Sequence, residues 1–443
     1  MTDIPSKLSR RDLMKLSGLG AAALTLPVAA AKPAQAAEKI KTNARIVIIG
    51  AGAAGLAAAS HLSQRLEGAA IILIDRRKAH YYQPGFTLVA AGLKPESYVT
   101  TATADYVRNG VELIEEQAAE IDPDGNKVVT DKGRVVPYDY LIVAAGLHLD
   151  YAAIEGMEVD KIGKDGLGGV YASPAAAVAT AKAMFEFAEK GGVGLFGRPA
   201  TEMKCAGAPL KYTFIVDDYL RRSGARGKSE IIYAAQNKTL FSVPIVSEKV
   251  RMLFRDRGVK VAYDRVMTAI DLSRKVATFK TPDGVEEIKY DFTNVVPPMR
   301  APDVVRNSPL PWRTGQWATE GWMDVDRGSL RHKRYPNVFG VGDIAGVPKG
   351  KTAASVKWQA PVAVDHLIAS IEGKTSDAVY TGYTSCPLIT QLGRAMLVEF
   401  DYENNLTPSF PGVIAPLEEL WITWVMKTMA LKPTYIAMLR GHA

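Results

Sequence analysis

Residues 44–55 read Ala-Arg-Ile-Val-Ile-Ile-Gly-Ala-Gly-Ala-Ala-Gly, a stretch in which an apolar run leads directly into closely spaced glycines. Its apolar first half is typical of a buried parallel strand, and the glycines that follow have the spacing G-x-G-x-x-G. A helix of small residues is predicted to run on to about Arg65. A second apolar strand at 71–74 then ends at Asp75. This order predicts a β-α-β unit with a dinucleotide-binding turn.

The three glycines and the acid of this unit have separate physical tasks. Gly50 permits the tight turn, Gly52 lets the backbone approach a pyrophosphate, and Gly55 lets helix and strand pack closely. The helix N-terminus offers N–H donors and the positive end of a dipole to the phosphates. Asp75, which lies 20 residues beyond Gly55, can accept hydrogen bonds from a ribose diol.

Two later segments indicate that the dinucleotide is FAD. One buried strand ends at Gly146, and another runs into Gly342-Asp343 ahead of a helix predicted at 353–372. Such segments recur in flavoproteins with two nucleotide folds, where the acid binds the ribityl chain and the helix N-terminus faces the flavin. We therefore expect FAD to bind here.

A second α/β region has no dinucleotide fingerprint. The strand at 193–197 is not followed by a glycine-rich turn, and the strand at 230–235 ends without the expected acid or arginine pair. A nicotinamide cofactor is therefore not expected. Helices are predicted at about 174–189 and 209–221, with further β structure over 258–296.

The predicted fold class is α/β, with two Rossmann-like folds, the FAD domain being interrupted by the second fold, and a C-terminal extension that contacts the membrane. The predicted boundaries are a signal peptide at 1–36, the first segment of the FAD domain at 44–160, the second fold at 161–296, the second segment of the FAD domain at 297–390 and the extension at 391–443.

The N-terminus has the features of an export signal. Residues 9–15 read as a twin-arginine motif, an apolar stretch of small residues follows at 16–31, and residues 34–36 fit a signal-peptidase site. Export by the twin-arginine pathway to the periplasm is predicted. Without residues 1–36 the net charge falls from +7 to +4, which does not argue for nucleic acid and is compatible with an anionic lipid surface.

The chain has two cysteines, Cys205 and Cys386. Cys205 lies between Lys204 and a helix predicted to begin near Pro209, and both a cation and a helix N-terminus favour the thiolate. Cys386 follows the flavin-facing helix. A structural disulfide stays open at this point, because an exported protein meets an oxidising compartment.

Over about residues 44–440 the sequence resembles the sulfide:quinone oxidoreductases, especially their mitochondrial-type branch. The motifs that carry the resemblance are His80-Tyr81-Tyr82-Gln83-Pro84, Lys204-Cys205-Ala206-Gly207-Ala208-Pro209, Pro297-Pro298-Met299, Gly342-Asp343, Lys351-Thr352-Ala353-Ala354 and Gly382-Tyr383-Thr384-Ser385-Cys386-Pro387-Leu388.

The resemblance implies that hydrogen sulfide attacks an oxidised pair of Cys205 and Cys386, bridged as a disulfide or a trisulfide. Cys386 then holds the sulfane sulfur as a persulfide, while Cys205 faces the non-covalent FAD and passes two electrons to it. Reduced FAD gives these electrons to a membrane quinone. The sulfane sulfur leaves on sulfite, a thiol or more sulfide. Gln83 and the backbone at Ala118 match FAD contacts, and Lys351 lies where it can balance negative charge on the reduced ring.

The sequence departs from the family pattern in one respect, because some members have a third cysteine. Schemes that require a third cysteine are therefore excluded. No general base can be carried over, and Glu158 and Glu202 are expected to be solvated. The six histidines have no metal-ligand spacing, so no metal is expected.

Apolar residues share one helical face at 417–427, where Trp421 and Trp424 suit a membrane interface, and a second apolar group lies at 435–439. Lys427 is expected on the polar side of this helix. The segment is too short to span a bilayer, and packing on the protein's own core or in a homo-oligomer is the alternative. A lipid-soluble acceptor favours membrane contact.

Three other functions compete with this one. The flavoprotein subunit of a flavocytochrome c sulfide dehydrogenase holds FAD through an extra cysteine, and residues 81–87 contain none. A sulfur-binding or sensing flavoprotein would need only a structural disulfide. An NADH:quinone oxidoreductase would need the nicotinamide fingerprint that is missing here.

Overall fold

The computed structural model describes residues 38–442, so the predicted signal at 1–36 lies outside the described residues. The glycine-rich stretch at 44–55 forms the predicted β-α-β unit together with the strand that follows it. The elements of this unit are β2 (Arg45–Ile49), α2 (Ala53–Arg65) and β4 (Ala70–Ile74).

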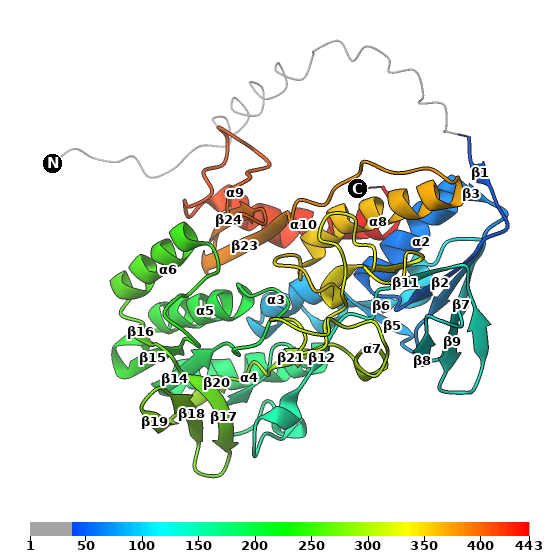
Figure 1. Ribbon diagram of the computed structural model, residues 1–443. Coiled ribbons are helices and arrows are strands. Elements are labelled where there is room, and N and C mark those ends of the chain that lie inside the picture. Colours follow the sequence, from blue (N-terminus) through cyan, green and yellow to red (C-terminus); the bar gives the residue numbers. More distant parts are fainter. Residues whose placement is uncertain (1–37, 443) are drawn as a thin grey trace, which may run out of the picture. The chain divides into compact units, whose positions relative to one another are not determined.

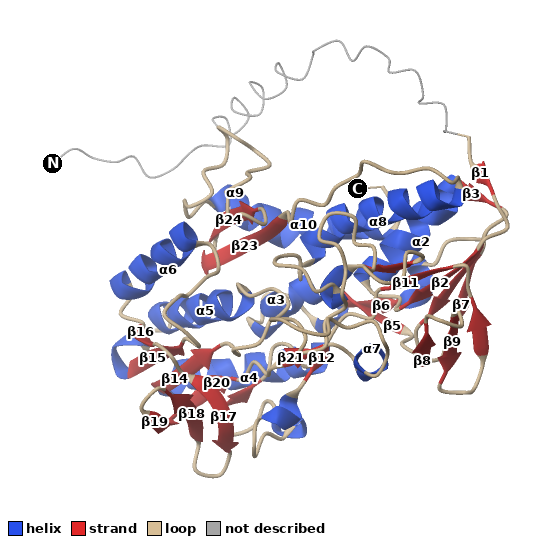
Figure 2. Cartoon of the chain, in the orientation of Figure 1, coloured by secondary structure: helices blue, strands red, loops and turns tan. Residues whose placement is uncertain are grey.

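These strands belong to a five-stranded parallel sheet of order β22-β11-β2-β4-β7. Helix α2 packs against α8, and Figure 2 shows the two helices side by side. The predicted hairpin-rich stretch is an antiparallel meander of three strands. The bounds are β7 (Val111–Ile114), β8 (Ala118–Asp122), β9 (Lys127–Thr130), β10 (Val135–Pro137), β11 (Tyr140–Val143), β22 (Val338–Gly340) and α8 (Ala353–Ile371).

The second nucleotide fold is inserted between β11 and β22. Its parallel sheet has the order β13-β20-β14-β15-β16, and an antiparallel sheet β17-β18-β19 adjoins it in the chain. The bounds are β13 (Leu167–Gly168), α4 (Pro174–Lys190), β14 (Gly192–Gly197), α5 (Ala208–Arg222), β15 (Ser229–Ala234), α6 (Pro244–Asp256), β16 (Lys260–Ala262), β17 (Val266–Asp271), β18 (Val276–Thr281), β19 (Gly284–Lys289) and β20 (Phe292–Asn294).

An antiparallel hairpin follows the two folds, made of β23 (Thr384–Gln391) and β24 (Arg394–Phe400). The hairpin extends across the domain boundary that the sequence predicts at residue 390. It packs on α5, and Figure 1 shows the orange hairpin beside this green helix. The hairpin therefore joins the second fold to the C-terminal extension.

The extension is helical from Trp421 to Leu439, in the order α9 (Trp421–Val425), a π-helical turn (Met426–Ala430) and α10 (Leu431–Leu439). The helix begins four residues later than the predicted start at Leu417. Its end is bound to the first fold, because Ser60 Oγ donates to Leu439 O at 2.6 Å and His80 Nε2 lies 2.8 Å from Tyr435 Oη. Between residues 38 and 442, we find no helix with the length and apolarity needed to cross a bilayer.

Shorter strands and helices connect these elements. They are β1 (Ile40–Lys41), β3 (Leu66–Glu67), β5 (Ala79–Tyr81), α3 (Phe86–Ala90), β6 (Thr100–Ala102), β12 (His148–Leu149), β21 (Met299–Arg300) and α7 (Asp303–Arg306).

Candidate active site

A cavity of about 810 Å³ lies over the dinucleotide turn, a volume in the usual range for ligand sites. Segments from the first fold, from the start of α5 and from the C-terminal helix all line it. Its lining includes these residues that the sequence selected: Gly50, Gly52, Asp75, Gln83, Ala118, Gly146, Cys205, Gly342, Asp343 and Lys351.

The geometry of the turn fits the tasks assigned to its glycines. Gly50 has φ +99°, and a Cβ there would lie 2.4 Å from Ala144 O. A Cβ on Gly55 would lie 1.7 Å from Gly50 O, so this glycine brings α2 against the turn and does not line the cavity. A Cβ on Gly52 would meet only Arg77 Nη2, at 3.9 Å. The backbone at Gly52 is therefore open to a phosphate at the N-terminus of α2.

Asp75 is buried at the end of β4. Its Oδ2 accepts a hydrogen bond from Ala51 N at 2.8 Å and pairs with Arg77 Nη2 at 2.8 Å. Burial alone would raise the pKa of Asp75, but the hydrogen bonds and charge of Arg77 outweigh burial and lower it. Asp75 is therefore an ionised acceptor beside the turn. Arg77 was not predicted from the sequence, although it lies two residues after the acid.

The far end of the cavity contains Asp343 and the N-terminus of α8. Lys351 Nζ donates to Asp343 O at 2.6 Å and to Ala345 O at 3.0 Å, and it lies 3.7 Å from the centre of the Trp322 ring. Burial lowers the pKa of Lys351 to about 8 and raises that of Asp343. Thr352 caps α8, whose first turn lines the cavity.

One cavity thus receives the N-termini of two helices, a glycine turn without side chains and a buried acid. This set matches the needs of a dinucleotide, whose diphosphate favours helix N-termini and whose ribose favours a carboxylate. The residues present therefore fit FAD.

Cys205 has a constrained backbone just before α5. Its φ is +48°, which is uncommon for a residue with a side chain and is found in functional segments. The conformation is held by hydrogen bonds: Cys205 N donates to Lys351 O at 2.9 Å, and Cys205 O accepts from Ala208 N at 2.7 Å and Tyr171 Oη at 3.1 Å.

Cys386 approaches the same point from strand β23. The two cysteines are free thiols, and their side chains hydrogen-bond to one another. The Cys386 sulfur lies against the Cα of Gly207, where a Cβ would be 2.4 Å from Cys386 Sγ. The fold therefore brings together two thiols that are 181 positions apart in the sequence.

The electrostatics of the pair favour a thiolate on Cys205. The hydrogen bond from Cys386 lowers the pKa of Cys205 well below its usual value, and the charges of Lys211 and Lys427 add to this effect against the cost of burial. The same hydrogen bond and burial raise the pKa of Cys386 well above its usual value. The pair therefore shares one proton, which stays on Cys386.

The lysine that the sequence placed beside this thiolate is not the one that binds it. Lys204 Nζ donates to Gln83 Oε1 at 2.6 Å, whereas Lys211 Nζ lies 3.5 Å from Cys205 Sγ. Lys211 lies in the first turns of α5, where its ammonium returns toward the preceding loop. Burial lowers its pKa, but attraction to Cys205 and Cys386 outweighs burial and the net pKa is raised.

Lys427 is the second cation that was not predicted to belong to the site. Lys427 was predicted to lie on the polar side of the C-terminal helix. Instead it is buried, and its Nζ donates to Pro84 O at 2.7 Å. Burial and, to a lesser extent, the nearby charge of Lys211 together lower the pKa of Lys427 to about 7. In residues 38–442 no three acidic, histidine or cysteine side chains are grouped so that they could hold a metal ion.

Comparisons with known proteins agree with this geometry. The pyridine nucleotide-disulphide oxidoreductase family matches residues 44–179. The mitochondrial sulfide:quinone oxidoreductase of Mus musculus is 35% identical over 378 residues, which cover 84% of this chain and 81% of that protein. Its counterpart in Dictyostelium discoideum is 35% identical over 377 residues, with the same coverage of 84% and 81%.

A solved structure has the same fold. It is the sulfide:quinone oxidoreductase of Aquifex aeolicus, with a TM-score of 0.72, 21% identity and coverage of 90% of this chain and 92% of that one.

Proposed function

Because this chain belongs to the sulfide:quinone oxidoreductase family, we propose that Cys205 and Cys386 are the groups through which it oxidises sulfide. The protein is an FAD-dependent oxidoreductase whose substrates are sulfide and quinone. The observation that carries the proposal is the contact between the two thiols at the edge of the dinucleotide cavity.

The roles of the cavity residues follow from their chemistry. Gly50, Gly52 and the N-terminus of α2 would bind the diphosphate of FAD, and Asp75 would bind its ribose. The N-terminus of α8 would face the flavin. When bound, FAD accepts two electrons and later releases them to quinone. Attachment is proposed to be non-covalent, since the chain has no cysteine besides the proposed redox pair.

The sulfur chemistry begins from the oxidised pair, written here as a disulfide. Hydrosulfide attacks Cys386 Sγ, the S–S bond breaks, and Cys205 leaves as a thiolate while Cys386 becomes a persulfide. Two features support this direction. The low pKa of Cys205 makes it the better leaving group, and Lys211 and Lys427 stabilise the charge that appears on it.

The cycle closes on the same two thiols. An acceptor such as sulfite, a thiol or a second sulfide removes the outer sulfur from Cys386 and leaves a thiol behind. The pair would then re-form its bridge and release the proton of Cys386 together with two electrons, which bound FAD would accept. Lys211 and Lys427 keep Cys205 in the ionised form that this step requires.

The C-terminal helix is proposed to contact the membrane and to admit the quinone. One side of it lines the cavity through Met426, Ala430 and Leu431. Elsewhere on the same helix Trp421 is 64% exposed and Met429 is 69% exposed. A helix that is apolar both toward a redox cavity and toward the outside gives a lipid-soluble acceptor a short route between them.

The proposed location is the periplasmic face of the membrane. The support is the twin-arginine motif, the apolar stretch and the cleavage site of residues 1–36. Fusing residues 1–36 to a reporter that is exported only when folded tests the signal. Export should be lost when Arg10 and Arg11 are both changed to lysine, and export that survives this change would contradict the pathway.

The decisive experiment is anaerobic stopped-flow mixing of the purified flavoprotein with sulfide. The flavin absorbance should bleach, and a short-chain quinone should restore it. Cys205→Ser and Cys386→Ser should each abolish the bleaching while the variants retain flavin. Bleaching by NADH but not by sulfide would overturn the proposal, and so would serine variants that are still reduced by sulfide at the normal rate.

A further inference from the structure

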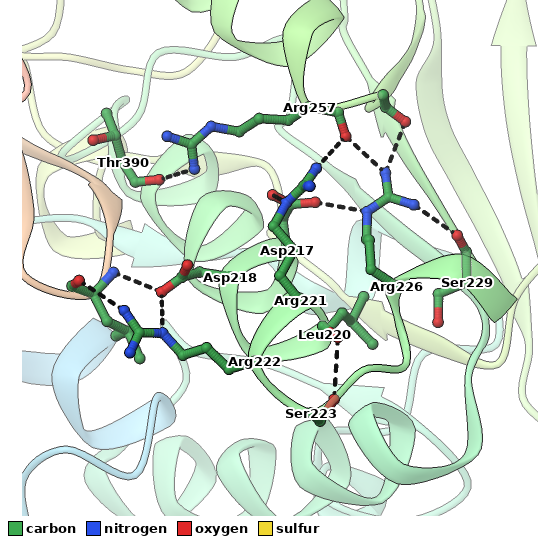
Figure 3. A network of polar contacts seen from close by, with 12 residues as sticks. Asp217, Asp218, Leu220, Arg221, Arg222, Ser223, Arg226, Ser229, Arg257 and Thr390 are labelled. Carbon is green, nitrogen blue, oxygen red and sulfur yellow. Dashed lines mark hydrogen bonds and ion pairs between the residues drawn. The ribbon is translucent and has the colours of Figure 1, made fainter. Parts of the chain in front are cut away.

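Two adjacent aspartates near the end of α5 each bind an arginine one turn further along the helix (Figure 3). Asp217, whose side chain is 0% exposed, pairs with Arg221 Nε at 2.8 Å and with Arg226 Nε at 2.7 Å. Asp218 pairs with Arg222 Nε at 2.8 Å. The arginines of the two groups make their further hydrogen bonds to different parts of the protein. We therefore assign a different role to each aspartate.

The Asp217 group stays inside the second nucleotide fold. Arg221 Nη2 donates to Arg257 O at 2.6 Å, and Arg226 donates to Arg257 O at 3.0 Å and to Ser229 O at 2.8 Å. These bonds tie the end of α5 to the residue after α6 and to the start of β15. Their effect is on the stability of this fold.

The Asp218 group reaches outside the fold to the turn of the β23–β24 hairpin. Asp218 Oδ2 accepts from Leu392 N at 2.9 Å, and Arg222 Nη2 donates to Leu392 O at 3.1 Å. The ion pair thus accepts from the backbone N–H of Leu392 and donates to its carbonyl oxygen. A neighbouring β-strand binds both backbone groups of a residue in the same way. Arg257 adds a bond to Thr390 O, near the end of β23 before the turn. It also pairs with Glu419 Oε2 at 2.8 Å.

The two ends of α5 therefore meet the same hairpin. At the N-terminal end, the Gly207 backbone touches the Cys386 sulfur, and Lys211 lies at the Cys205 sulfur. Between the ends, apolar side chains such as Ile215 and Ile389 pack without exposure. Apolar packing is not directional, so it lets a hairpin tilt. Hydrogen bonds at the far end prevent that tilt.

We propose that Asp218, Arg222 and Arg257, here called the hairpin clamp, are positioning residues that set the separation of the Cys205 and Cys386 sulfurs. None of the three lines the cavity. Their effect on sulfide turnover rests on the proposed function, whereas their effect on the thiol pair does not.

The test measures the equilibrium constant for closing the pair, that is, for forming a disulfide between Cys205 and Cys386. The flavoprotein is equilibrated with reduced and oxidised glutathione, and the remaining thiols are counted by alkylation. On closing, the two cysteines form one S–S bond and pass two electrons and the one proton of Cys386 to one glutathione disulfide, which becomes two glutathione thiols by taking a second proton from solvent. Asp218→Ala should lower the closing equilibrium constant by about 10- to 100-fold, because small displacements of reacting groups cost this much.

A conservative variant separates geometry from charge. Asp218→Asn keeps an oxygen that can accept from Leu392 N, so it should recover most of the loss. Asp218→Ala should also raise the pH midpoint for alkylation of Cys205, because Cys386 no longer donates to it. Glu248→Gln removes an exposed ion pair with Arg251 on α6 and should change neither measurement.

If Asp218→Ala does not fold, Arg222→Met and Arg257→Met are measured in its place. Each of these two variants removes one contact with the β23–β24 hairpin. Asp217→Asn should lower the melting temperature and leave the closing constant unchanged. The proposal fails if all the clamp variants melt earlier but close normally. Since glutathione replaces sulfide and quinone in this assay, failure of the proposed function would leave its result intact.

Discussion

At the scale of single residues, Gly207 is the position beside the thiol pair where a side chain would fit least well. A methyl group there would lie 2.4 Å from Cys386 Sγ, and the neighbouring atoms include the buried ring of Phe241 at 3.4 Å. The sulfur must therefore leave its present position if this residue gains a side chain. Pairing of the two thiols therefore requires a residue without a Cβ atom at position 207.

We therefore expect Gly207→Ala to slow flavin bleaching by sulfide by about 10- to 100-fold. Overpacking should also cost about 1–3 kcal/mol of unfolding free energy. Stopped-flow absorbance and urea titration measure the two effects. Gly227→Ala is the matched control, because a Cβ at Gly227 meets nothing within 4 Å. Equal rates for the two variants would contradict the contact between Gly207 and Cys386.

Lys427 gives a prediction of pH dependence. The titratable groups that interact with Cys205 are Cys386 on β23, Lys211 on α5, Lys427 on the C-terminal helix, Tyr171, Lys204 and Asp343. Protonated Lys427 stabilises the thiolate, and with a pKa of about 7 it loses its proton as the pH rises above neutrality. Lys427→Met removes this charge at every pH.

The variant should therefore raise the pKa of Cys205 and move the alkylation midpoint of the reduced enzyme to higher pH. The difference from the native protein should be largest below pH 7 and should vanish above it. Lys182→Met, at an exposed position on α4, is the control and should leave the midpoint in place. A midpoint that moves to lower pH in Lys427→Met would show that the lysine does not act on Cys205 through its charge.

At the scale of elements, the C-terminal helix links the cavity to the outside of the protein. Replacing Trp421, Ile422 and Met429 by serine removes exposed apolar surface without touching the cavity lining. Each side chain contributes about 1.5–3 kcal/mol when fully buried, so the triple variant should lose at least tenfold in binding to lipid vesicles. Vesicle flotation measures this.

Turnover with a water-soluble quinone should stay unchanged in the triple variant, since the redox site is intact. Val285→Ser, at a 75% exposed position on β19, is the control for general loss of apolar surface and should float normally. Vesicle binding that survives the triple substitution would remove the helix as the membrane contact.

The sequence predicted elements well where the pattern is local, and less well elsewhere. The β-α-β unit follows from one run of residues, and its strands and helix are confirmed. Helix α6 was not predicted, although Val246, Val250, Leu253 and Phe254 have the spacing of a buried helical face. Its other face carries many charges, so the amphipathic pattern of a surface helix is present in the sequence and is a signal that could have found it.

The candidate site was predictable only to a limited extent, for a physical reason. Gly50, Gly52 and Asp75 are close in sequence, so spacing alone brings them together at one end of a parallel sheet. Lys211 and Lys427 come from distant elements, and what brings them to Cys205 is packing between α5, the hairpin and the C-terminal helix. No local pattern records such contacts.

At the scale of the whole molecule, two buried histidines make stability depend on acid. His80 bonds Tyr435 across the join between the first fold and the C-terminal helix, and His332 Nε2 lies 2.9 Å from Leu310 O. Burial lowers the pKa of each from 6.5 to about 4. The folded state therefore resists protonation, and its stability falls as the pH drops from about 6.5 toward 4.

We expect each histidine to cost about 2 kcal/mol between pH 8 and pH 5 by linkage. His80→Gln combined with His332→Gln should flatten this fall, measured as unfolding free energy or melting temperature at both pH values. His148→Gln, at an exposed position, should keep the native slope. An unchanged slope in the double variant would assign the acid sensitivity to other groups.

The join between α2 and the end of α10 also bears on how the protein is made. The dinucleotide turn leaves the ribosome long before Tyr435 and Leu439, which fasten the C-terminal helix onto the first fold. The nascent chain therefore exposes its nucleotide pocket until α10 has also emerged, and it can enclose a cofactor only from that point on. A chain truncated before Tyr435 would therefore leave the pocket open and should lose the same cofactor more readily.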